Sequence, residues 1–94
     1  MIGQLVYSKA GHDKGTLYVI VGEEEEIVYL SDGRLKKPEA PKKKRRKHIQ
    51  PINQMIDDAL RARLAGGATV YPEELMTAIK KYKKVLTTNN KNMP

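Results

Sequence analysis

Residues 3–31 contain two runs of β-forming side chains separated by a five-residue loop that begins and ends with glycine. The runs, residues 5–7 and 17–21, are too short for helices, too apolar for loops, and made almost entirely of β-branched, aromatic or leucine residues. Gly11 and Gly15 bound the loop, and glycine adopts backbone conformations that are rarely open to other residues. The segment therefore predicts a strand, a tight loop and a second strand.

Three further strands are expected after this unit. Residues 27–30 follow four consecutive glutamates, which suit a solvated turn better than a paired ladder. An Asp-Gly pair then gives a hairpin signal that leads into a short fourth strand at residues 34–36. Residues 48–50 are expected to form the fifth strand. Because Pro51 lacks a ladder donor, that strand should lie at an edge of the sheet or stop there.

After Asn53 the apolar pattern changes to a helical period. Ile56, Leu60 and Leu64 recur every four residues after an asparagine that suits a helix cap, and a glycine pair ends this helix. A second helix is expected from Pro72, with an apolar stripe and lysines on the opposite arc. The stripe is Leu75, Ile79, Tyr82 and Leu86, and the lysines are Lys80, Lys81, Lys83 and Lys84. Residues 88–94 are polar and expected to be disordered.

The composition limits the classes of function. A chain of 94 residues predicts one domain with a small core, which argues against a deep catalytic cleft. Without cysteine it has no disulfide or thiolate, as suits a reducing compartment, and it carries no apolar run of membrane length and no export signal. We therefore expect a cytoplasmic protein that is monomeric when free and does not meet a membrane.

His12 and Asp13 could suggest catalysis, because a carboxylate can orient an imidazole. However, the chain offers no thiol and no obvious serine partner, and a loop of this size would hardly supply an oxyanion site. His12 and His48 are the only histidines, too few for a metal site unless carboxylates converge on them. We expect no enzyme activity, no metal and no cofactor.

Positive charge is concentrated in one segment. The net charge is +7, and residues 34–48 hold nine of the 18 lysines and arginines but only one of the 11 acidic residues. Such a run repels itself, so residues 36–48 are expected to form an extended, mobile loop until an anion neutralises them. A solvated tail and a nuclear-import signal are alternatives. The favoured interpretation is a phosphate-binding arm, because each cation placed on a phosphate releases counterions.

The strand-loop-strand unit resembles the KOW motif of ribosomal proteins and transcription elongation factors. The resemblance rests on a glycine eight positions before Gly11, on Lys14-Gly15 and on a valine-rich second strand. It extends over roughly the first 55 residues, where the chain is similar to small bacterial KOW proteins related to archaeal and eukaryotic large-subunit ribosomal proteins. The segments that carry this extension are Asp32-Gly33-Arg34-Leu35, residues 41–49 and Gln50-Pro51-Ile52. Many KOW motifs have a further glycine where this chain has Leu17 and Tyr18.

The resemblance implies a small five-stranded SH3-like β-barrel over residues 1–54 with its basic loop at 36–48. With the two-helix extension that the helical period predicts over 55–87, the expected fold class is α+β. The resemblance also implies a non-catalytic protein that binds RNA, chiefly ribosomal RNA, and lies beside ribosomal proteins. The expected RNA-binding residues are Lys9, Gly11, His12, Lys14, Gly15, Arg34, Lys36, Lys37, Lys42, Lys43, Lys44, Arg45, Arg46, Lys47 and His48. The alternative is a KOW module that docks on proteins of the transcription or translation machinery.

Overall fold

Five antiparallel strands and two α-helices make up the computed structural model, which describes residues 1–91 and, for residues 87–91, only the backbone. The strands are β1 (Gln4–Ser8), β2 (Leu17–Glu23), β3 (Ile27–Ser31), β4 (Lys42–Arg45) and β5 (Ile49–Met55). The 3-10 turn η1 (Arg46–His48) joins β4 to β5, and the helices are α1 (Asp58–Ala65) and α2 (Pro72–Lys91). The α+β class expected from the sequence is confirmed.

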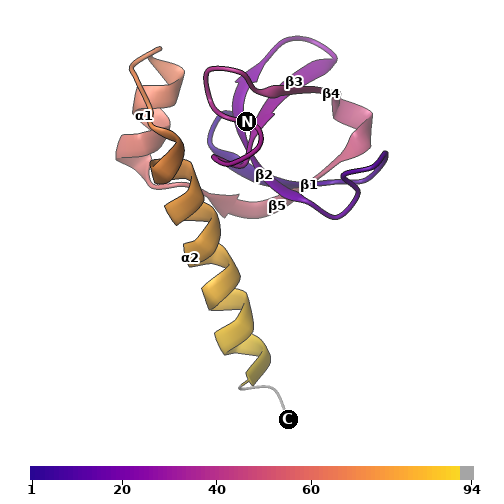
Figure 1. Cartoon of the computed structure of the whole chain (residues 1–94), viewed down its shortest axis with the longest axis vertical. Helices are drawn as coiled ribbons and strands as arrows, with labels where there is room; N and C mark the ends of the chain where they lie inside the picture. The colour runs from indigo at the N-terminus through magenta and orange to yellow at the C-terminus, as the bar shows by residue number, and fades with distance from the viewer. Residues whose placement is uncertain (92–94) are drawn as a thin grey trace.

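The sheet has the order β4-β3-β2-β1-β5, so β4 and β5 are its two edges and hydrogen bonds do not close it. Figure 1 shows the sheet curled so strongly that η1 bridges from one edge strand to the other. The edge position of β5 confirms the expectation drawn from Pro51, which pairs with Val6 of β1. The strand itself is longer than expected and runs to Met55.

Strands β1 and β2 are buried on both faces, which explains why their sequences are apolar without alternation. Successive side chains of a strand point to opposite faces. One face packs with the inner residues of β3 and β5 in the cluster Val6, Tyr18, Ile20, Val28, Leu30 and Ile49. The other face packs against the helices in the cluster Leu5, Leu17, Val19, Ile56, Leu60, Val70, Leu75 and Ile79. The helices are therefore part of the core.

The fourth strand is not where the sequence predicted it. Residues 34–36 form a bend, because the backbone N–H groups of Arg34 and Lys36 both donate to Asp32 Oδ1 at 2.9 Å. These donors are satisfied locally and take no part in a ladder. Residues 42–45, expected to lie in a mobile basic loop, form β4 instead and pair with β3. The expectation of a mobile loop over 36–48 was wrong for this part.

Both helices were predicted, but the start of the first one was not. Asn53 belongs to β5, and α1 begins at Asp58 with Asp57 as its cap, whose side chain accepts a hydrogen bond from Leu60 N at 2.9 Å. The second helix begins at Pro72, as predicted. Residues 88–91, expected to be disordered, continue α2. Residues 92–94 of that expected tail lie outside the described residues.

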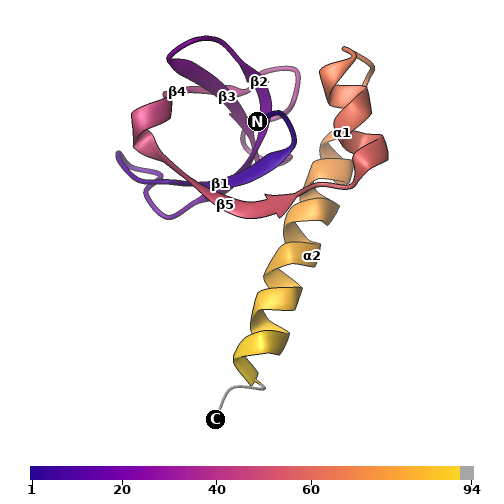
Figure 2. The same cartoon turned by 180° about the vertical axis from the view of Figure 1, so that it is seen from behind.

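Helix α2 is fixed to the sheet at its N-terminal end. Leu75 is fully buried and Ile79 is 7% exposed in the core that faces the helices. Gly33 lies against the first turns of α2, where a Cβ would come within 2.3 Å of the Pro72 carbonyl oxygen. Figures 1 and 2 both show the C-terminal half of α2 extending past the sheet. Within residues 1–91, no helix combines the length and apolar character needed to cross a membrane.

Candidate functional site

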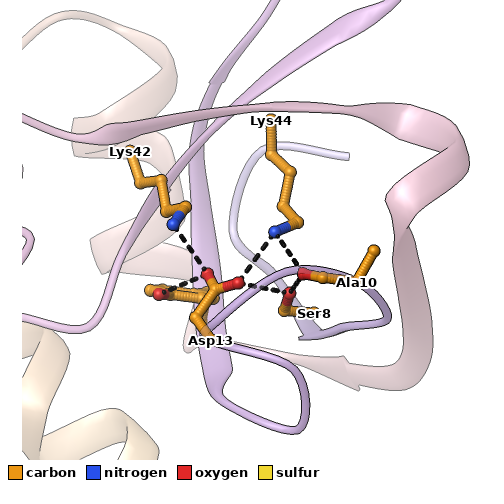
Figure 3. Close-up of polar contacts among 6 residues, drawn as sticks. Ser8, Ala10, Asp13, Lys42 and Lys44 are labelled. Carbon is orange, nitrogen blue, oxygen red and sulfur yellow. Dashed lines mark hydrogen bonds and ion pairs between the residues drawn. The ribbon is translucent and has the colours of Figure 1, made fainter.

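Asp13 lies at the centre of a polar cluster beneath the basic strand (Figure 3). Its Oδ1 accepts hydrogen bonds from Ser8 Oγ at 2.9 Å and from Lys44 Nζ at 2.8 Å. Its Oδ2 accepts from the Tyr18 hydroxyl at 2.9 Å and lies 3.1 Å from Lys42 Nζ. We call these five residues the Asp13 cluster. It links the glycine-bounded loop to β4, two segments about 30 residues apart in the chain.

The Asp13 cluster is largely enclosed, since the Asp13 side chain is 14% exposed and that of Lys44 is 9% exposed. Burial pushes the pKa of Asp13 upward, but the donors from Lys44, Tyr18, Ser8 and Lys42 outweigh it and hold the pKa well below its usual range. Burial, followed by the hydrogen bond to Asp13, raises the pKa of Tyr18 well above its usual range. The carboxylate therefore pairs with both Lys42 and Lys44, and because it carries one negative charge the three side chains together keep a net charge of +1.

Along β4 and η1, which together we call the basic strand, side chains with an acidic or carbonyl partner alternate with exposed cations. Lys42 and Lys44 face the Asp13 cluster, and Arg46 binds Glu23 Oε1 at 2.9 Å and the Glu24 carbonyl at 2.7 Å. The intervening residues Lys43, Arg45 and Lys47, which we call the outer cations, are exposed. Among the described residues, nothing forms a hydrogen bond or ion pair with the side chains of the outer cations.

The glycine-bounded loop has the backbone geometry that its sequence predicted. Gly11 and Gly15 have φ values of +85° and +89°, in the left-handed region. The side chains of Lys9, His12 and Lys14 are exposed around it. The Lys9 backbone N–H donates to the His48 carbonyl at 2.8 Å, which places this loop beside η1 and the end of the basic strand.

The remaining predicted residues divide into two groups. His48 is half-buried, and its described interaction is through the backbone carbonyl. Arg34, Lys36 and Lys37 are exposed on the segment that follows β3, and Arg34 lines a cleft against α2. The structure therefore brings the loop cations and the outer cations to one region of the sheet and places Arg34 beside the helix.

The arrangement of Asp13 bears on the catalytic alternative. With four donors on its two oxygens, the carboxylate is occupied by the fold and contacts Ser8, Tyr18 and two lysines, not His12. Within the described part of the chain, no group of three or more histidine, cysteine or acidic residues is placed to hold a metal ion. The chemical feature of this surface is a set of exposed cations on the edge strand β4 and on η1.

Three residues of the Asp13 cluster were not among the site residues expected from the sequence: Ser8, Asp13 and Tyr18. Ser8 and Tyr18 each lie five residues from Asp13, one on each strand that flanks the loop. A polar residue at the end of the first apolar strand was the available signal for Ser8. No signal in the sequence linked Asp13 to lysines about 30 residues away. Comparison with protein-family models finds no match to the chain, and comparison with curated proteins also finds none.

Replacing Tyr18 by phenylalanine is expected to lower the free energy of unfolding by about 2 kcal/mol, since the hydroxyl donates to a charged, enclosed carboxylate. Urea denaturation would measure the change. Tyr29→Phe is the matched control, because the Tyr29 hydroxyl donates to the exposed Glu24 carboxylate, and we expect it to leave the urea midpoint near the wild-type value. Equal losses in the two variants would contradict a central role for the Asp13 cluster.

Proposed function

We propose that this protein is a non-catalytic RNA-binding protein of the ribosome, in which an SH3-like barrel of the KOW type presents cations to ribosomal RNA. The observation that carries the proposal is the row of outer cations, Lys43, Arg45 and Lys47, next to the loop that carries Lys9 and Lys14. Cations without internal partners are available to phosphates, and each phosphate neutralised releases counterions.

The proposal assigns different roles to neighbouring residues of the basic strand. Lys42 and Lys44 are both paired with Asp13 and hold the loop against β4, so their role is structural. The outer cations supply the contacts, and because Lys43 and Arg45 lie on a paired strand and Lys47 lies in η1, they lose little backbone freedom on binding. We expect recognition of RNA shape, since duplex RNA hides its base edges in a deep, narrow major groove. The protein would act in the cytoplasm as a monomer, beside ribosomal proteins.

A second candidate function is docking on a protein of the transcription or translation machinery. It is favoured by a groove of about 380 Å³ between the end of β5 and α2, next to which Met55 and Val85 are 43% and 49% exposed. Exposed apolar side chains beside a groove are common at protein interfaces. The groove and the outer cations are different surfaces, so one experiment can separate the two candidates.

The test compares two variants that each remove two charges from β4. We expect Lys43→Gln with Arg45→Gln to weaken binding to a hairpin RNA about tenfold at moderate salt and to reduce the log-log salt slope by about 1.5, because two phosphate contacts are lost. Lys42→Gln with Lys44→Gln should reduce the slope by less than half as much, because both ammonium groups are paired with Asp13, which offsets one of their two charges. Fluorescence anisotropy across a salt series measures both.

Circular dichroism at the binding temperature checks that each variant is folded, since the second pair belongs to the Asp13 cluster. Equal slope changes in the two variants would mean that only total charge matters and that the outer cations are not the contact. If the wild-type protein does not bind the hairpin at low salt, the RNA proposal fails and protein docking becomes the leading candidate.

A further inference from the structure

A cleft of about 230 Å³ lies between the sheet and α2, away from the outer cations. From the sheet side it is lined by Thr16, Asp32 and Arg34, and from α2 by Lys80 and Lys83. The charged groups therefore sum to +2, and they come from two separate segments of the chain, the bend after β3 and α2. The sequence predicted that these α2 lysines lie on the polar side of a helix, but it did not predict that they lie near Arg34.

The position of Arg34 relative to α2 is fixed by the backbone. Gly33 packs against Pro72 and Met76, with no room for a Cβ, so the segment that carries Arg34 lies directly against the first turns of α2. Asp32 Oδ1 accepts hydrogen bonds from the backbone N–H groups of Arg34 and Lys36, and these bonds stabilise the bend. The guanidinium is thus carried on an ordered segment, although its side chain is exposed.

On α2, Lys80 and Lys83 are three residues apart and so share one side of the helix. The buried residue Ile79 anchors this turn of α2 in the core. Lys81 lies on a different side and lines the groove beside β5. The helix therefore directs two of its lysines toward Arg34, while the neighbouring Lys81 lies elsewhere.

The cleft continues the surface assigned above to RNA. Thr16 directly follows the glycine-bounded loop, and Lys14 is two residues before it, a backbone span of at most about 7 Å. An RNA strand that leaves the loop therefore meets the cleft next. Arg34 can contact a phosphate through two N–H groups, and the lysines add point charges around the same position.

We propose that Arg34 and Lys80 form a second phosphate subsite, with Lys83 on the same side of α2, through which α2 takes part directly in RNA binding. This proposal rests on the proposed RNA-binding function. It gives α2 a role beyond completing the core. The protein would then contact RNA at two places, the outer cations and the Arg34 cleft, with the glycine-bounded loop between them.

Two variants of α2 test the subsite with equal loss of charge. We expect Lys80→Gln to lower the salt slope for a hairpin RNA by about 0.8, and Lys81→Gln to change it by less than about 0.3. Arg34→Gln alone should lower the slope by about 0.8 and leaves the backbone hydrogen bonds of the bend in place. Thermal melts of all three variants are expected to stay near the wild-type midpoint.

The outcomes separate this proposal from the one it rests on. Equal slopes for the two α2 variants, together with a wild-type slope for Arg34→Gln, would overturn the subsite. If Lys43→Gln with Arg45→Gln still lowers the slope in that case, the RNA-binding function stands without the subsite. If the wild-type protein binds no RNA, both proposals fall. If a variant that combines the cleft and β4 substitutions loses salt slope equal to the sum of the separate losses, the result would support two separate contacts on one RNA.

Discussion

Asp13→Asn is expected to lower the free energy of unfolding by about 3 kcal/mol at neutral pH. The substitution keeps the size of the side chain and removes the charge that faces Lys44, whose side chain is 9% exposed, and Lys42. An enclosed ammonium without its counterion is costly because little water reaches it. Urea denaturation at pH 7 would measure the loss, and Glu39→Gln, which removes an exposed carboxylate, should leave the midpoint near the wild-type value.

A double variant separates the lost charge from a general disturbance of the loop. Adding Lys44→Met to Asp13→Asn removes the enclosed ammonium as well, and we expect it to recover at least about 1 kcal/mol of the loss. No recovery would mean that the hydrogen bonds to Ser8 and Tyr18, and not the charge pair, account for the effect.

The same pair gives stability a defined dependence on pH. The pKa of Asp13 is lowered in the folded protein, so its contribution is present in full above the pKa of the unfolded carboxylate, about 3.9. That contribution is lost as the pH falls from there toward the lowered folded-state pKa. The stability difference between the wild-type protein and Asp13→Asn should therefore be constant above about pH 5 and shrink in more acidic solution. A difference that grows on acidification would contradict the assignment.

Gly33→Ala is expected to cost about 3 kcal/mol or more, the second large effect. The residue has a φ of +74°, which an alanine adopts only with strain of about 1 to 2 kcal/mol. The added Cβ would also come within 2.3 Å of the Pro72 carbonyl oxygen and within 2.9 Å of Met76 N, both backbone atoms. Relieving that overlap requires α2 to move away from the sheet, which adds a packing cost. Thermal unfolding would measure the sum.

Gly15→Ala is the matched control, because Gly15 has a φ of +89° but a Cβ added there would have no neighbouring atom within 4 Å. It should show the conformational cost alone, about 1 to 2 kcal/mol. The difference between the two variants then measures how tightly the segment after β3 is packed on α2. Similar losses for both would mean that the helix adjusts at little cost.

Local patterns in the sequence predicted three of the five strands and the start of the second helix. The apolar runs at residues 5–7, 17–21 and 27–30 became β1, β2 and β3, and Pro72 marked the start of α2. Strand β4 was missed because lysine and arginine have weak strand propensity and no apolar alternation marks residues 42–45. Its pairing depends on β3 and on Asp13, contacts that only the folded chain brings together.

The candidate site was predicted in composition but not in arrangement. Counting cations identified the basic segment, yet it could not distinguish Lys43 from Lys44, which differ only in the face of β4 that they occupy. That distinction appears once the register of β4 against β3 is known, with Lys44 opposite Val28 and Lys43 opposite Tyr29. The α2 lysines were placed on a polar arc, but their convergence with Arg34 follows from the packing of Gly33.

The edge position of β4 has a consequence for self-association. An exposed strand edge is a template on which another molecule can add a strand, and this is a common route to aggregation. Here every residue of that edge is a lysine or an arginine, so a second copy adding in register would bring like charges directly opposite one another. The β4 edge is thus protected against edge-to-edge assembly most strongly at low ionic strength, and salt weakens that protection.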